Sequence, residues 1–315
     1  MASEIPTGIL VLAYGTPETL DDVEPYYTHI RHGRRPSDEA LADLRYRYER
    51  VGGQTPLYEL TKGVADQLRE RLDADYPGRY KVYLGMKHWH PYINEVVPQI
   101  IADGVEDVIG VVLAPHYSRY SLEGYRTYTE QALAQQDGSF RFHFIESWHE
   151  HPLFRQLIAR RIQDALQAFP EDVRDDVRVV FSAHSLPEKI VSQGDPYTEQ
   201  LHESAAGIAE MVGLRQYGFC FQSAAPTPEP WLGPDILDYL EQLHAEGVRY
   251  VLSVPFGFVA EHLEVLWDID TEAQEKAAEL GMMLKRIRMP NADPEFVEVI
   301  EAVALEEDRR RQATA

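Results

Sequence analysis

Short apolar runs of strand length alternate with longer amphipathic stretches along nearly the whole chain. The runs lack strict polar alternation, which is typical of strands that are covered by helices on both faces. This alternation predicts an α/β protein built on open, mainly parallel sheets. The expected strands are residues 8–15, 80–87, 105–118, 140–147, 177–185, 216–223 and 248–259, and the expected helices are residues 38–50, 57–76, 91–103, 121–136, 151–168, 197–212, 234–246, 261–280 and 294–311.

The order of these segments predicts two similar halves. Four of the expected strands lie before about residue 150, and three follow a helix that begins near His151. We therefore expect a first domain at residues 1–150 and a second at residues 151–315, with the last helix packing back on the first domain.

The charge balance narrows the classes of partner. The chain has 30 Lys and Arg against 52 Asp and Glu, a net charge of −22, so it lacks the basic excess that nucleic acids or anionic membranes attract. No apolar stretch approaches the roughly 18 residues of a membrane span, and MASEIPTG carries no positive leader. We expect a cytoplasmic protein. Because Cys220 is the only cysteine, we expect no disulfide and no four-cysteine metal site.

Titratable side chains follow several of the expected strands. In open α/β sheets, ligands bind outside the carboxyl ends of the strands. Tyr14, Lys87 and His184 occupy such positions, and Glu264 lies one turn into the expected helix that follows the last run. His184 at a strand end is either a metal ligand or proton acceptor, or a structural histidine.

Three carboxylates follow at intervals of four residues: Glu264, Asp268 and Glu272. In a helix they would share one face, where like charges cost roughly 0.2–0.5 kcal/mol per pair. The stripe is either a solvated acidic surface or a site for cations. His184 and Glu264 together would suit a divalent first-row ion, held weakly enough to exchange.

The region 26–57 combines cations with aromatic rings. Arginine forks bind carboxylates or phosphates, and rings stack on planar ligands, so the region predicts either an anion clamp or a helix with ordinary salt bridges. Trp231, in the proline-rich loop TPEPWLGPD, is either a stacking residue or a packing residue. The arginines are Arg31, Arg34, Arg35, Arg45, Arg47 and Arg50.

Motifs from residue 8 to about residue 300 resemble one family. LAYGTP, GMKHWHP, SAHSLPEK, TPEPWLGPD and GFVAEHLEVLWDID are similar to motifs of the ferrochelatases, and most similar to the coproporphyrin ferrochelatases of Gram-positive-type bacteria. The chain departs from the family at His32, where an arginine is usual, and at Ala225 and Pro226, where a Gly-Asn pair is frequent.

The resemblance implies two Rossmann-like domains, each with a doubly wound, mainly parallel four-stranded sheet, and a porphyrin cleft between them. It implies insertion of Fe²⁺ into coproporphyrin III to give coprohaem, with release of two protons, in haem biosynthesis. Fe²⁺ would be a substrate, and no prosthetic group and no iron–sulfur cluster is expected. The implied partners are the two substrates and, transiently, the downstream coprohaem decarboxylase, and the implied state is a monomer.

The resemblance also assigns residues. His184 and Glu264 match the inner pair that handles the metal and the protons, and Asp268 and Glu272 match outer acidic positions that relay metal or protons. The positions that match porphyrin contacts are Tyr14, Arg31, Arg47, Tyr48, Thr55, Lys87, Tyr125 and Trp231. Thr55 replaces a frequent serine and keeps the hydroxyl.

Three alternatives remain at this point: a ferrochelatase that uses protoporphyrin IX, a tetrapyrrole carrier without insertion chemistry, and a chelatase for cobalt or nickel.

Overall fold

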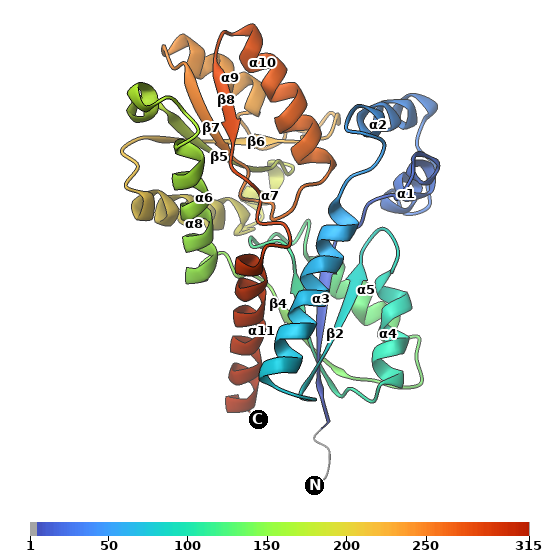
Figure 1. The fold of residues 1–315 in the computed structure, drawn as a ribbon. Helices are drawn as coiled ribbons and strands as arrows, with labels where there is room; N and C mark the ends of the chain where they lie inside the picture. The colour runs from blue at the N-terminus through green and yellow to red at the C-terminus, as the bar shows by residue number, and fades with distance from the viewer. Residues whose placement is uncertain (1–4, 315) are drawn as a thin grey trace. The chain divides into compact units, whose positions relative to one another are not determined.

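Each half of the chain folds around its own parallel sheet (Figure 1). The computed structural model describes residues 5–314 and separates two units. The first unit contains the residues up to 148 together with the C-terminal stretch from 291, and the second contains residues 149–290. Both four-stranded sheets place their first strand second in the order, which is the arrangement of a doubly wound fold. The expected α/β fold with two Rossmann-like sheets is confirmed.

In the first unit, the sheet order is β2-β1-β3-β4. Every residue of β1 is buried because both of its edges are paired and both faces of the sheet are covered. Helices α4 and α5 pack on one face, whereas α3 and α11 lie side by side on the opposite face (Figure 1). The elements are β1 (Thr7–Ala13), η1 (Leu20–Asp22), α1 (Val23–Ile30), α2 (Asp38–Arg50), α3 (Leu57–Asp75), β2 (Tyr80–Met86), α4 (Ile93–Ala102), β3 (Asp107–Val112), α5 (Glu123–Leu133), β4 (Arg141–Ile145) and α11 (Pro294–Thr314).

Ionic contacts tie the C-terminal helix α11 to the first unit. Asp308 is 1% exposed and accepts hydrogen bonds from Arg79 Nη2 at 3.0 Å and from the Tyr80 hydroxyl at 2.8 Å. Arg311 Nη2 donates to Thr7 Oγ1 at 2.7 Å. Burial alone would raise the pKa of Asp308, but these donors lower it below the usual value. The helix is therefore part of the first unit, although it is last in the sequence.

In the second unit, the sheet order is β6-β5-β7-β8. Helices α9 and α10 and the π-helix η3 bury an apolar cluster that includes Cys220, whose thiol is fully buried. Helices α6 and α8 pack against each other. The elements are α6 (Pro152–Leu166), η2 (Glu171–Asp176), β5 (Arg178–His184), α7 (Lys189–Ser192), α8 (Tyr197–Val212), β6 (Tyr217–Gln222), α9 (Ile236–Ala245), β7 (Tyr250–Val254), η3 (Val265–Ala273), α10 (Gln274–Glu279) and β8 (Met283–Arg286).

Several elements differ from the sequence-based expectation, among them β8, α1 and β3. Strand β8 was not predicted, because its four residues MLKR lie at the sheet edge and form no apolar run. Helix α1 was not predicted, because VEPYYTHI contains Pro25 and few strong helix formers. The expected strand 105–118 is paired only over Asp107–Val112, and its polar end APHYS forms a loop.

No helix among residues 5–314 is long and apolar enough to cross a membrane.

Candidate active site

The carboxyl ends of β5 and β7 carry the strongest candidate pair in the second unit. His184 is the last residue of β5, and Glu264 follows β7 at the start of the next helix. In the order β6-β5-β7-β8 the chain reverses its winding direction between these two strands, which is where doubly wound folds bind ligands. Nδ1 of His184 lies 2.8 Å from Oε2 of Glu264. The structure therefore brings together two residues that are 80 positions apart in the sequence.

The pair is polarised by its surroundings. Burial alone would lower the pKa of His184, but the Glu264 carboxylate, with a smaller effect from Asp268, raises it above the usual value. Burial would raise the pKa of Glu264, yet His184 and His262 hold it well below the usual range. His262 Nδ1 donates to the Ala260 carbonyl at 2.9 Å, and its Nε2 lies 3.8 Å from Glu264 Oε2. Glu264 is thus a carboxylate between two imidazoles.

The helix after Glu264 is not the regular α-helix that the spacing predicted. Val265–Ala273 forms a π-helix, in which the backbone bonds run from residue i to i+5, and the Thr271 hydroxyl donates to the Leu266 carbonyl at 2.9 Å. The expectation of carboxylates one α-helical turn apart is therefore wrong in its geometry. Local side-chain bonds such as that of Thr271 are one reason why an i, i+4 pattern does not reveal the wider turn. Such π-segments occur frequently at functional sites.

The outer carboxylates differ in their exposure. Asp268 is 6% exposed and accepts a short hydrogen bond from the Ser223 hydroxyl, whereas Glu272 is half-buried. Ser223 directly follows β6 and has a positive φ of 65°. A solvated acidic face therefore describes Glu272 better than Asp268, because burying a carboxylate requires partners.

Trp231 lies in the loop between β6 and α9. Its indole Nε1 donates to Thr227 Oγ1 at 2.7 Å, and its backbone bridges that of Pro187, close to the end of β5. Trp231 is half-buried, so part of the residue is accessible to a ligand.

In the first unit, Tyr14 follows β1 and its ring packs against His88, which is paired with a second histidine. Its ring is 42% exposed and lies 4.6 Å from the ring of His88, centroid to centroid. His88 Nδ1 lies 3.0 Å from His29 Nδ1, so one nitrogen donates and the other accepts. Burial, with smaller effects of nearby cations, lowers the pKa of His88 to about 3. Gly15 permits this arrangement, because a Cβ there would lie 2.8 Å from the Trp89 backbone nitrogen.

Lys87 follows β2 and lies over an aromatic ring. Its Nζ is 5.0 Å from the centre of the Tyr125 ring and donates to the Ser121 carbonyl at 3.2 Å. Burial lowers the pKa of Lys87 to about 8 and raises that of Tyr125. Gly124 leaves the space for the ammonium group, because a Cβ there would lie 2.5 Å from Nζ.

Thr55 and Tyr48 meet at a buried hydroxyl cluster. Thr16 Oγ1 lies 2.9 Å from Thr55 Oγ1 and 3.3 Å from the Tyr48 hydroxyl, and all three residues are buried. The cluster fixes the loop after β1 against α2 and the start of α3. Tyr48 therefore has a packing role whether or not it contacts a ring.

The arginine-rich region separates into paired and unpaired cations. Arg35 pairs with Glu24 at 2.6 Å and with Asp38 at 2.8 Å, and Arg47 pairs with Asp43 at 3.0 Å. The salt-bridge interpretation therefore holds for these two arginines. Arg31 is exposed, lies 5.8 Å from the Tyr27 ring centre, and forms no ion pair with another residue of 5–314. Like Arg34, which is also exposed and forms no ion pair with another residue of 5–314, it is placed to take an external anion.

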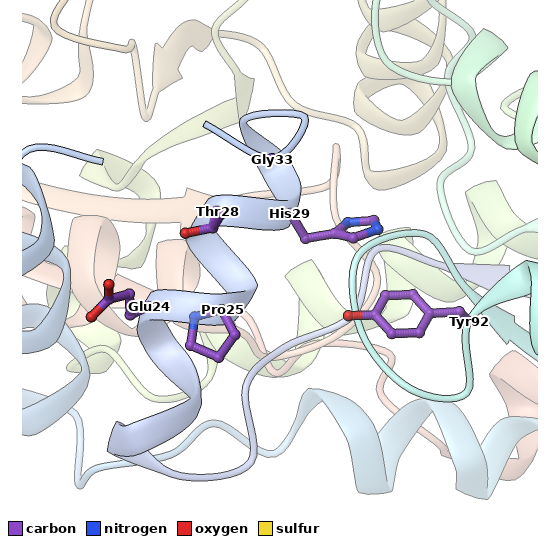
Figure 2. Close-up of a pocket in the computed structure, with 6 residues that line it drawn as sticks. All are labelled: Glu24, Pro25, Thr28, His29, Gly33 and Tyr92. Carbon is purple, nitrogen blue, oxygen red and sulfur yellow. The ribbon is translucent and has the colours of Figure 1, made fainter. Parts of the chain in front are cut away.

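A pocket of about 490 Å³ lies beside α1 (Figure 2). Figure 2 shows the His29 side chain extending from α1 toward Tyr92, which lies just before α4, and their ring centroids are 4.9 Å apart. The pocket contains none of the predicted site residues. Its lining residues are Glu24, Pro25, Thr28, His29, Gly33 and Tyr92.

The structure thus groups the predicted residues into local sets within each unit: His184 with Glu264, Lys87 with Tyr125, and Tyr48 with Thr55. It adds His262 to the first set, places His88 and His29 beside Tyr14, and places Ser223 beside Asp268. The motif GMKHWHP contains His88, and His262 lies two residues before Glu264, so the sequence held a signal for both. It held none for Ser223 or His29, because their contacts depend on the fold.

Comparison with known proteins connects this geometry to a family. The ferrochelatase family model matches residues 6–308. The chain belongs to the ferrochelatase family. It is 54% identical over 297 residues to a ferrochelatase of Herpetosiphon aurantiacus, covering 94% of this chain and 97% of that protein. It is 42% identical over 300 residues to the coproporphyrin III ferrochelatase of Bacillus subtilis, covering 95% and 96%. The predicted family is therefore confirmed, and the chain is assigned to the lyases that insert iron into a porphyrin.

Solved chelatases share the fold at low sequence identity. SirB from Bacillus subtilis with Fe³⁺ has a TM-score of 0.60 and 12% identity, with 98% of each chain covered. The sirohydrochlorin chelatase SirB from Bacillus subtilis subspecies spizizenii in complex with cobalt has a TM-score of 0.56 and 12% identity, again with 98% coverage of each.

Proposed function

We propose that the protein is a coproporphyrin III ferrochelatase, which inserts Fe²⁺ into coproporphyrin III and releases two protons. The observation that carries this proposal is the hydrogen-bonded pair of His184 and Glu264 at the carboxyl ends of β5 and β7, in a chain of the ferrochelatase family. The substrate follows from relatives of 42–45% identity that are coproporphyrin III ferrochelatases.

The second unit supplies the metal and proton chemistry of this proposal. Nδ1 of His184 bonds to Glu264, and its Nε2 makes no hydrogen bond with another residue of 5–314. That nitrogen can bind the incoming Fe²⁺ or accept a proton from a pyrrole N–H, and Glu264 stabilises the imidazolium that results. Because only two protein ligands are offered, the ion is under-coordinated and can leave toward the porphyrin. Asp268 and Glu272 would lead cations or protons along the π-helix.

The first unit supplies the groups that hold the ring. Arg31, without an acidic partner in the described chain, would take a propionate. Tyr14 would present its exposed ring to the macrocycle, and Trp231, in the second unit, is a predicted porphyrin contact. Lys87 and Tyr125 form a cation and a ring that a carboxylate could approach. Arg47, Tyr48 and Thr55 complete the set as predicted porphyrin contacts.

Binding energy from the carboxylates of the ring would offset the distortion that exposes a pyrrole lone pair. Four propionates supply more of this remote binding energy than two, so a substrate with four propionates is favoured over one with two. The monomeric state, the cytoplasmic location, the transient contact with a coprohaem decarboxylase and the lack of a prosthetic group or iron–sulfur cluster stay predictions of the proposal.

The test of the substrate is a direct competition. Fe²⁺ is supplied anaerobically with coproporphyrin III and protoporphyrin IX in one reaction, and the two haem products are separated by chromatography. We expect coprohaem to dominate by at least tenfold in kcat/KM. Dominant protohaem would instead show a protoporphyrin ferrochelatase, and tight binding of both rings without any product would show a carrier.

A further inference from the structure

One arginine contacts two carboxylates of the acidic segment, one inside the π-helix and one before it. Arg286 ends β8 and is 13% exposed at its side chain. Its Nε donates to Asp270 Oδ1 at 2.8 Å and its Nη2 donates to Asp270 Oδ2 at 2.7 Å. The guanidinium therefore binds one carboxylate through two parallel hydrogen bonds. Nη2 also donates to Glu261 Oε1 at 3.2 Å, and Nη1 donates to the Ile287 carbonyl at 3.0 Å.

The two partners of Arg286 flank the proposed metal-handling residues. Glu261 lies three residues before Glu264, and Asp270 lies inside the π-helix between Asp268 and Glu272. The segment therefore concentrates negative charge that repels itself at short range. The carboxylates of this stretch are Glu261, Glu264, Asp268, Asp270 and Glu272.

We propose that Arg286 is a positioning residue for metal insertion. It neutralises Glu261 and Asp270, to which it is hydrogen-bonded, and anchors the π-helix to β8. Glu264 is thereby kept beside His184, and Asp268 beside Ser223. This role rests on the proposed function, and it assigns to Asp270 and Glu261 the task of orienting the helix, not of binding the metal.

The geometry distinguishes this contact from an ordinary surface ion pair. A planar fork holds Asp270 in one orientation, which the single ammonium of lysine cannot reproduce. The same helical region offers a matched contrast in Lys276, which pairs with Glu241 at 2.7 Å. Glu241 is 56% exposed, so this ion pair lies largely in solvent. Such a pair should have little influence on a site elsewhere.

The proposal is tested by Co²⁺ binding to the full-length protein, followed by visible absorption and by competition with a chelating dye. The site of interest is the Co²⁺ that His184→Ala removes from the titration. We expect Arg286→Met to weaken Co²⁺ binding at this site at least tenfold, Arg286→Lys to recover only part of the loss, and Lys276→Met to stay within twofold of the wild type. Coproporphyrin affinity, measured by fluorescence quenching, should stay within twofold in all of these variants.

A purely structural role would lower thermal stability and leave Co²⁺ affinity unchanged in the folded protein, so an Arg286→Met protein with native circular dichroism and wild-type Co²⁺ affinity overturns the proposal. If Arg286→Met does not fold, Asp270→Asn breaks the same fork, and the same tenfold weakening is expected. A wild-type protein without a His184-dependent Co²⁺ site also overturns it. Because Co²⁺ binding requires no turnover, a protein that passes this test yet inserts no Fe²⁺ would contradict the proposed function alone.

Discussion

Glu264→Gln should lower the pKa of His184. The substitution keeps the size of the side chain and removes the charge that lies 2.8 Å from Nδ1 of the imidazole. In the wild type this charge outweighs burial and raises the pKa of His184 above its usual value of about 6.5. Without it, burial dominates, and the pKa should fall below that value.

The size of the shift follows from the geometry. A hydrogen bond to a charged group contributes about 1.5–3 kcal/mol. Because 31% of the His184 side chain and 35% of the Glu264 side chain are exposed to solvent, the low end of that range, about 1.5 kcal/mol, applies. The carboxylate therefore favours the imidazolium over the neutral ring by about 1.5 kcal/mol. Asp268 still favours the imidazolium in the variant and limits the shift.

The assay is an NMR titration of the imidazole signals between pH 5 and 9, with the His184 resonance assigned by its loss in His184→Ala. Glu241→Gln is the matched control, because it removes a carboxylate of the same unit that pairs with Lys276, and the His184 pKa should then stay within about 0.2 units. An unchanged His184 pKa in Glu264→Gln would refute the electrostatic account of the pair.

The directions of the pKa shifts of His184 and Glu264 also predict how the stability of the second unit depends on pH. The raised pKa of His184 means that its contribution is complete below the unfolded value of about 6.5 and is lost as the pH rises through the folded value. The lowered pKa of Glu264 means that its contribution is present above about 4.3 and is lost as the pH falls. The pair should therefore stabilise the second unit most between these two limits.

Three further outcomes are expected. Asp308→Asn should lower the free energy of unfolding by about 2 kcal/mol at pH 7, because it weakens charge-assisted hydrogen bonds to a buried carboxylate. In urea titrations, the difference in this free energy between the variant and the wild type should shrink below about pH 4, and an equal difference at every pH would contradict this. Gly124→Ala should displace the Lys87 ammonium into water and raise the pKa of Lys87 from about 8 toward its usual value. NMR of ¹³C-labelled lysine measures this pKa, and an unchanged value would contradict the close packing of Lys87 against Gly124. Arg31→Gln should weaken coproporphyrin binding about tenfold in fluorescence titrations. Arg35→Gln removes a cation that is already paired and should change the affinity less than threefold, so equal effects of the two substitutions would contradict the distinction between the two arginines.

The sequence predicted the fold well where apolar runs are long. Strand β1 is a continuous apolar run and lies at the sheet centre, so pattern and structure agree. The four-residue strand β8 is held by pairing with β7 and not by its own pattern, and Tyr-rich α1 is a helix despite weak local propensity. Both elements depend on tertiary contacts that a local pattern does not contain.

The candidate site was predictable to a similar degree. The position of His184 at the end of a strand and the spacing of the carboxylates were visible in the sequence. The π-helix was not visible in the sequence, because residues four apart lie near one another in an α-helix and in a π-helix. The partners Ser223 of Asp268 and Arg286 of Asp270 come from distant strands, and no local pattern connects them.

The central claim is that His184 and Glu264 carry out metal insertion. The most direct measurement is a single-turnover reaction of protein-bound coproporphyrin III with Fe²⁺ under anaerobic conditions, followed by the absorption change that accompanies metallation. We predict metallation by the wild-type protein that is at least a hundredfold faster than in protein-free solution, and a rate near that of free solution in His184→Ala, with ring binding retained. A His184→Ala variant that metallates the bound ring at the wild-type rate would contradict the account.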